Sequence, residues 1–178
     1  MITDCDIVIP WGIDGNLGAA YNRSMQKIND WVIFQDHDVI QLNPFWYHMV
    51  LDVIAALGHT AGLITGTTNL IACPMQFCPD APKSLDLVEH MQFSKDMFQK
   101  FGNQPYMVVA ENMPLAFSGF FMVTHKEAWE KVGGFKDGFL GVDNAYHHAV
   151  LNSGYKTYVI PGLYMFHLYY HKTRWEKM

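Results

Sequence analysis

Short apolar runs alternate with longer amphipathic stretches along this chain, and this alternation limits the folds open to it more than any other feature. Runs rich in β-branched and aromatic residues predict strands at residues 6–10, 31–35, 61–65, 119–123 and 155–160. Stretches whose apolar residues recur every three or four positions predict helices at 16–28, 43–58, 84–101, 124–132 and 143–152. Alternating strands and helices are typical of an α/β sandwich, so we expect a central, largely parallel sheet flanked by helices.

Residues suited to helix ends refine these predictions. Asn43 can cap a helix and Pro44 suits the first helical position, so one helix is expected to begin there. Thr124 and Glu127 have the spacing of a capping box, which predicts a second helix start. Residues 72–83 contain Pro74, Pro79 and Pro82, and this stretch is expected to form a loop.

Length and composition favour one folded unit. The chain has 178 residues, of which 50% are hydrophobic and 16% charged, and this suits a single compact domain over residues 1–178. The formal net charge is −5, and Lys and Arg form no cluster in the sequence. A nucleic-acid partner is therefore not expected, because phosphate backbones select basic surfaces.

The cysteines and the first residues bear on the cellular compartment. Cys5, Cys73 and Cys78 are too few, and odd in number, for a disulfide framework. Cys73 and Cys78 could pair or share a metal ion, but free thiols in a reducing compartment are the favoured interpretation. Asp4 and Asp6 stand where a secretory leader would be basic and then apolar, and no apolar run reaches about twenty residues. The expected location is the cytoplasm, with peripheral attachment to a membrane as the alternative.

Two carboxylates, Asp36 and Asp38, follow the apolar run at 31–35. In α/β sheets, ligands bind outside the carboxyl ends of strands, which is where these residues are expected. If the strand continued to residue 38, both side chains would share one face and repel each other by about 1 kcal/mol or more. A hard divalent cation such as Mg²⁺ or Mn²⁺ would turn that repulsion into attraction. The alternative is a solvated turn in which Asp38 opens the loop toward Asn43.

A succession of motifs in residues 118–167, "SGFFMVTHKEAWEKVGGFKDGFLGVDNAYHHAVLNSGYKTYVIPGLYMFH", adds family information. It comprises Gly119, Trp129, Gly133-Gly134-Phe135, Phe139-Leu140-Gly141, Asp143 and Gly154-Tyr155. Their order and spacing resemble the C-terminal half of family 2 glycosyltransferases, which have the GT-A fold. Upstream, "NLGAAYN" at 16–22 is similar to the Asn-x-Gly-x-x-x-Asn helix that precedes the Asp-x-Asp strand of that family. The resemblance covers most of the chain.

The resemblance implies roles for individual residues. Asp36 and Asp38 match the pair that holds the metal ion and the nucleotide-sugar diphosphate, and His167 matches a third metal ligand. Asp143 matches the general base of inverting members, and Asn144 is expected to bond the acceptor hydroxyl. The residues expected at the donor pocket are Pro10, Trp11, Asn16, Gly18, Asn22, His37 and Gly119. From the residues alone, a helix cap for Asp143 and core packing for His167 stay open.

The resemblance also implies an activity. It is that of a hexosyltransferase dependent on Mn²⁺ or Mg²⁺, which uses a nucleotide-diphosphate sugar, with a UDP-sugar as the first expectation. The acceptor would be a saccharide, as in polysaccharide biosynthesis, or another hydroxyl compound. One alternative is nucleotidyl transfer, for which Arg23 and Lys27 are the only basic residues nearby in sequence. A second alternative is a catalytically degenerate domain that binds carbohydrate or serves as a scaffold.

The chain departs from the family pattern near its start. Only "WGIDG" at 11–15 separates the first predicted strand from the helix at 16–28, where the family has a longer segment with an acidic residue that reads the base. Asp14 is the expected substitute. The family often has Glu-Asp where this chain has Asp143 and Asn144. The short chain therefore resembles a trimmed GT-A domain, and a homo-oligomer or a partner subunit is expected to complete it.

Aromatic and histidine residues near the predicted site have two interpretations. Trp11, Tyr164, Phe166 and Tyr169 could stack on sugar rings, but core packing is the favoured interpretation. His171 follows His167 at helical spacing and is given no metal role. His147 and His148 are expected to border the acceptor site or solvent. Residues 72–105 match no pattern and are expected to form acceptor-side structure, with 91–101 as an amphipathic helix.

Overall fold

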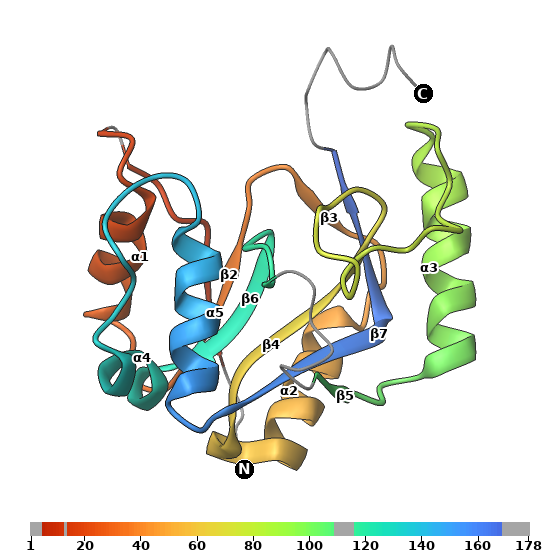
Figure 1. Cartoon of the computed structure of the whole chain (residues 1–178). Helices are drawn as coiled ribbons and strands as arrows, with labels where there is room; N and C mark the ends of the chain where they lie inside the picture. The colour runs from red at the N-terminus through yellow and green to blue at the C-terminus, as the bar shows by residue number, and fades with distance from the viewer. Residues whose placement is uncertain (1–4, 13, 109–115, 169–178) are drawn as a thin grey trace.

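A computed structural model describes residues 5–12, 14–108 and 116–168 as a mixed α/β structure (Figure 1). The strands are β1 (Asp6–Val8), β2 (Trp31–Gln35), β3 (Val39–Gln41), β4 (Ala61–Thr68), β5 (Tyr106–Val108), β6 (Phe121–His125) and β7 (Lys156–His167). The helices are α1 (Leu17–Met25), α2 (Trp46–Leu57), the short 3₁₀ helix η1 (Gly58–Thr60), α3 (Leu87–Phe101), α4 (Lys126–Val132) and α5 (Val142–Asn152). All five predicted strands and all five predicted helices are present, with shifted ends.

The seven strands form one sheet in the order β1-β2-β6-β4-β7-β3, with β5 paired to β7. Only β1 with β2 and β4 with β7 are parallel, and the other pairings are antiparallel. The prediction of a largely parallel sheet is therefore wrong. One cause is β6, which runs against both of its neighbours. The other is β7, which is long enough for β5 and β3 to pair antiparallel with its two halves.

Helix starts follow the hydrogen bonds of individual side chains. Asn16 caps α1, because its side chain accepts a hydrogen bond from the backbone N–H of Ala19. Helix α2 begins at Trp46 and not at Pro44, since the Asn43 side chain accepts from Phe45 N–H and closes a turn ahead of the helix.

The capping box predicted at Thr124 is wrong. Strand β6 continues to His125, so the Thr124 hydroxyl lies inside the sheet, 2.8 Å from the carbonyl oxygen of Gly62. The imidazole of His125 replaces it as the cap of α4 and accepts a hydrogen bond from Ala128 N–H at 3.2 Å. A histidine ring nitrogen can take this role when it is unprotonated.

Both faces of the sheet are covered, because alternate residues of β2 point to opposite sides. Ile33 belongs to a core cluster with Val53 and Ile54 of α2. Phe34 belongs to a second cluster with Tyr21 of α1 and residues of α5. Helices α1, α4 and α5 lie together at one side of Figure 1, and α3 lies beside β7 at the other.

Several further predictions are settled by burial. Tyr164 and Phe166 are buried in the protein interior, which confirms the core interpretation for both. The same interpretation is wrong for Trp11, which is 75% exposed because the segment after β1 lies at the surface. Cys5, Cys73 and Cys78 are all buried. Residues 72–83 form a loop, as predicted. Tyr169 and His171 lie outside the described residues. In the part of the chain that is described, the helices are too short or too polar to cross a membrane.

Candidate functional site

The two aspartates lie in the turn between β2 and β3. The strand ends at Gln35, and the backbone N–H of Val39 donates to the carbonyl of Asp36 at 3.2 Å, so the expected extended conformation through residue 38 is not formed. The turn nevertheless delivers both carboxylates to one place, because β3 pairs with the end of β7 and sets Val39 opposite His167. Asp36, Asp38 and His167 each offer a ligand atom, and these atoms lie within 4.8 Å of one another.

His167 and Asp38 are in direct contact. Nε2 of His167 lies 3.3 Å from Oδ1 of Asp38, and Nδ1 lies 3.2 Å from the carbonyl oxygen of Leu70. A carbonyl only accepts, so Nδ1 carries the hydrogen of that bond and Nε2 faces the carboxylate. In the neutral imidazole, Nε2 and the carboxylate would be two electron-pair donors facing each other. A shared proton or a metal ion satisfies both.

The two aspartates have opposite pKa shifts. Burial, with repulsion from Asp38 and Asp143, raises the pKa of Asp36 to about 6, although His167 opposes the shift. The hydrogen bond from His167 lowers the pKa of Asp38. The two carboxylates suit Mn²⁺ or Mg²⁺, whereas an imidazole is a ligand more typical of transition-metal ions, so the group as a whole favours Mn²⁺ over Mg²⁺. These residues therefore fit the cation that the sequence predicts.

Asp143 stands in the first turn of α5. Its Oδ2 accepts a hydrogen bond from the backbone N–H of Gly119. A Cβ on Gly119 would lie 2.9 Å from the Cβ of Asp143, so only glycine allows this approach. Gly119 therefore positions the carboxylate.

Two adjoining cavities meet at this site. The first has a volume of about 480 Å³ and contains Asp143, Asn144 and Gly119 in its wall. The second has a volume of about 340 Å³ and contains Pro10, Trp11, Asn16, His37 and Asp38. The residues common to both walls are Leu17, Asp36, Phe139 and His167. The proposed metal ligands thus lie at the junction of a cavity that holds Asp143 and a cavity that holds most of the predicted donor residues.

Gly18 and Asn22 are not brought to either cavity, so the structure does not support their predicted donor contacts. A Cβ on Gly18 would lie 1.9 Å from the carbonyl oxygen of Lys136, which shows how closely α1 approaches the following loop. The Asn22 side chain accepts from Trp129 Nε1 and Phe135 N–H, both at 2.9 Å, and donates to the Phe135 carbonyl. Both residues hold the segment that leads to α5.

Asn144 and His147 support the wall of the first cavity. Nδ2 of Asn144 donates to the carbonyl of Phe117 at 2.9 Å. His147 was expected to border the acceptor site or solvent, but it is fully buried, and its Nδ1 accepts from Phe117 N–H at 2.7 Å. Burial, with a smaller contribution from His148, lowers the pKa of His147 to about 4. Through this bond the neutral ring holds Phe117, two residues before Gly119, against α5.

Basic side chains are missing from the described walls of the two cavities, but Arg23 lies close to the second cavity. Among the described residues, neither cavity wall contains Lys or Arg. Arg23 and Lys27 line a hollow of about 300 Å³ that shares Trp11 with the second cavity. A Cβ on Gly12, in the wall of the second cavity, would lie 3.4 Å from the Arg23 guanidinium. Asp14, the expected substitute for base recognition, accepts from Asn16 N–H at 3.0 Å and lies 3.9 Å from the Arg23 guanidinium. Asp14 is not part of either cavity wall.

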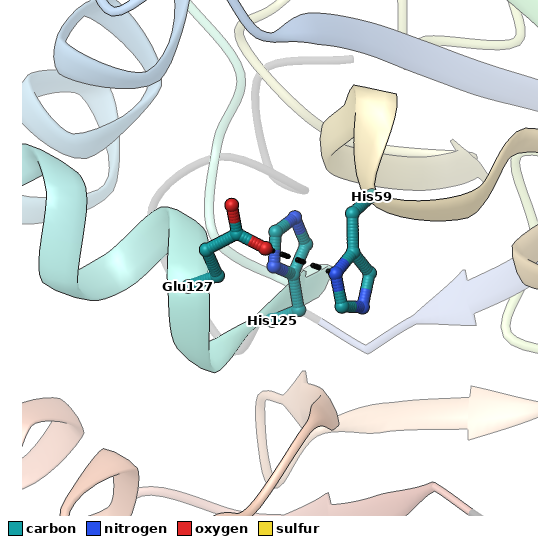
Figure 2. A group of neighbouring side chains, drawn as sticks. All are labelled: His59, His125 and Glu127. Atoms are coloured by element: carbon teal, nitrogen blue, oxygen red, sulfur yellow. Dashed lines mark hydrogen bonds and ion pairs between the residues drawn. The ribbon is translucent and has the colours of Figure 1, made fainter.

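A second group of titratable side chains, which the sequence did not indicate, lies near the opposite ends of the strands. Figure 2 shows His59, His125 and Glu127, with Nδ1 of His59 3.0 Å from Oε2 of Glu127. Nε2 of His59 lies 2.9 Å from Oδ1 of Asp30. The two imidazoles stack with centroids 4.4 Å apart and planes 6° apart.

This second group is better suited to holding the fold together than to binding a metal ion. An imidazole binds metal in its ring plane, and one ion cannot lie in two parallel planes that are this far apart. Nδ1 of His125 already accepts the hydrogen bond that caps α4. His59 instead joins η1 to the start of β2, through Asp30, and to the start of α4, through Glu127.

No model of a known protein family matches this chain, and no curated protein shows significant sequence similarity to it. What the site can do follows from its residues and their geometry.

Proposed function

We propose that this chain is a compact GT-A glycosyltransferase that moves a hexosyl group from a nucleotide-diphosphate sugar to a hydroxyl acceptor, with Mn²⁺ or Mg²⁺ as cofactor. One observation carries the proposal. Asp36, Asp38 and His167 converge at the junction of two cavities, one of which contains a positioned carboxylate, Asp143. That arrangement suits a donor on one side of a metal ion and an acceptor on the other.

The donor side needs a cation. The second cavity would receive the nucleotide, with Trp11 and His37 in its wall. The same wall contains the carboxylates of Asp36 and Asp38. Since its described wall contains no Lys or Arg, a diphosphate would meet net repulsion there without a bound cation. Asp36, Asp38 and His167 would hold that ion, which supplies charge neutralisation at the departing diphosphate. A UDP-sugar is the first donor to test.

The acceptor side needs a base. Asp143 opens into the first cavity and is held by Gly119 N–H. A hydroxyl group bound there would give its proton to the Asp143 carboxylate as its oxygen attacks the anomeric carbon. Asn144, in the same wall, would orient the hydroxyl. Direct attack by an acceptor oxygen that Asp143 deprotonates corresponds to inversion.

A binding or scaffold domain is the second candidate, because Asp14 is engaged by Arg23 and Asn16 and does not reach the donor cavity. Nucleotidyl transfer is less well supported, since Arg23 and Lys27 lie outside both walls around the aspartates.

The test of the proposed function is turnover. The full chain is incubated with Mn²⁺ and, one at a time, UDP-glucose, UDP-galactose and UDP-N-acetylglucosamine, and released UDP is measured with and without acceptors. We expect metal-dependent release that Asp143→Asn lowers by about 100-fold or more, because a general base contributes about that much. Release that is unchanged in Asp143→Asn contradicts the assigned base. No release with any donor, despite binding of UDP, favours the binding domain.

A further inference from the structure

The wall of the first cavity combines polar and apolar side chains. Its polar side chains are Tyr21, Asp36, Ser118, Asp143, Asn144 and His167. The apolar side chains are Leu17, Leu70, Ile71, Ala72, Phe120, Phe139 and Leu140. Ligand sites commonly combine a few placed polar groups with an apolar lining.

Two of these apolar side chains are strongly exposed. Phe139 is 64% exposed and Leu140 is 89% exposed, although both line the cavity. Gly138 and Gly141 flank them with φ angles of 128° and 71°. Large apolar side chains that gather at the mouth of a cavity, next to polar groups, are typical of a surface that a ligand covers.

The base of this loop is fixed by hydrogen bonds. Gly18 N–H donates to the Gly138 carbonyl at 3.1 Å, and Gly138 N–H donates to Oδ1 of Asn16 at 3.0 Å. Because Gly18 and Asn16 belong to the start of α1, Phe139 and Leu140 are presented from an anchored turn. Their exposure is therefore a property of the folded loop.

The charges of the wall restrict the acceptor further. Asp36 and Asp143 are acidic, and among the described residues no Lys or Arg faces this cavity. A phosphate or carboxylate on the acceptor would lack a cationic partner and would be repelled by the base.

We propose that the acceptor is an uncharged compound whose reactive hydroxyl adjoins an alkyl or aryl body, and that Phe139 and Leu140 cover this body. This inference rests on the proposed transferase function. In the step, the acceptor O–H bond breaks and its proton passes to Asp143, while a bond forms between the acceptor oxygen and the anomeric carbon. The bond from that carbon to the diphosphate oxygen breaks, and its electron pair leaves with the nucleoside diphosphate.

The test compares probes that share one sugar and differ in the attached group. Hexyl β-glucoside, methyl β-glucoside and glucose 6-phosphate are titrated calorimetrically into the full chain with Mn²⁺ and UDP present, all below micelle-forming concentrations. We expect the hexyl compound to bind at least about tenfold more tightly than the methyl compound, because each buried methylene adds to the affinity. Glucose 6-phosphate should not bind. Equal affinity for the hexyl and methyl compounds, or tighter binding of the phosphate, overturns the inference.

A matched pair of variants assigns the effect to the loop. Leu140→Ser should remove most of the hexyl preference, because Leu140 lines the first cavity only. Val88→Ser is the control, since Val88 is 72% exposed on α3 and belongs to neither wall. Thermal unfolding verifies that both variants are folded. A hexyl preference that Leu140→Ser leaves intact contradicts the assignment.

UDP binding is recorded in the same samples, so the two proposals can fail separately. If UDP does not bind but the hexyl compound still binds more tightly than the methyl compound, the transferase proposal is contradicted and the apolar binding site is supported. If UDP binds but the hexyl and methyl compounds bind equally, the transferase proposal stands and the proposal of an apolar acceptor is contradicted.

Discussion

His167 faces Asp38 across the pairing of β3 with β7, with Nε2 3.3 Å from the carboxylate oxygen Oδ1. The contact joins the turn between β2 and β3 to the end of β7, two parts of the site that lie far apart in the chain. Asp36 completes the group of ligand atoms. A metal ion held by these three residues would therefore also stabilise the pairing of β3 with β7.

Manganese should stabilise the folded protein through this group. At a concentration about 100 times its dissociation constant, a ligand that binds only the folded state adds about 2.7 kcal/mol to the free energy of unfolding. Asp38→Asn should lose most of that gain, because the amide carries no charge. Thermal unfolding with increasing Mn²⁺ measures the effect. Asp80→Asn, an exposed carboxylate in the loop at 72–83, is the control and should respond like the wild type.

Asp36 should make the metal-free protein less stable as the pH rises. Its folded pKa is raised from 3.8 to about 6, so its stabilising contribution is complete below 3.8 and is lost as the pH rises through 6. Asp36→Asn should therefore raise the free energy of unfolding of the metal-free protein near neutral pH by up to about 3 kcal/mol. The same variant should abolish stabilisation by Mn²⁺. If Asp36→Asn is less stable than the wild type in the presence of a chelator, the raised pKa assigned to Asp36 is contradicted.

Gly119→Ala should disturb Asp143. The added Cβ would lie 2.9 Å from the Cβ of Asp143 and 3.2 Å from its Oδ2, so the first turn of α5 must shift. We expect the free energy of unfolding to fall by about 1–3 kcal/mol. We also expect turnover to fall by more than the fraction of unfolded protein accounts for. Chemical denaturation and UDP release measure the two effects. Wild-type turnover in a folded Gly119→Ala protein would show that this carboxylate needs no fixed position.

Buried His147 should make the protein sensitive to acid. Burial lowers its pKa from 6.5 to about 4, so its contribution is complete above 6.5 and is lost as the pH falls toward 4. His125 is shifted in the same direction, also to about 4. The unfolding temperature should therefore drop over this range. His147→Gln should flatten the drop in part, with His125 responsible for the remainder. An unchanged pH profile in the variant would contradict the burial of a neutral ring.

The sequence predicts best those features that depend on neighbouring residues. Long apolar runs and amphipathic stretches indicate the main strands and helices, and the position of Asp36 after β2 indicates the site. Strands β3 and β5 have three residues each, which is too short for a periodic pattern, and both depend on pairing with β7. Strand direction in the sheet also depends on pairing and was not predictable.

The site residues show the same division. Asp38 and His167 stand in contact between the turn after β2 and the end of β7, and their role as metal ligands stays a prediction. Gly18 and Asn22 have a motif that suggests ligand binding, but their contacts are with residues more than 100 positions away, in the segment after α4. His147 is polar in sequence, and its burial is explained by its bonds to Phe117 N–H and to the Thr157 hydroxyl. Such long-range contacts leave no local signal.

The proposed metal–diphosphate site is tested by calorimetric titration of UDP into the protein, with and without Mn²⁺. We expect binding of UDP that requires Mn²⁺ in the wild type and is lost in Asp38→Ala. GDP and deoxythymidine diphosphate, titrated in the same way, report which base the second cavity accepts. If none of the three diphosphates binds in the presence of Mn²⁺, or if binding persists unchanged in Asp38→Ala, then Asp36, Asp38 and His167 are not a metal–diphosphate site.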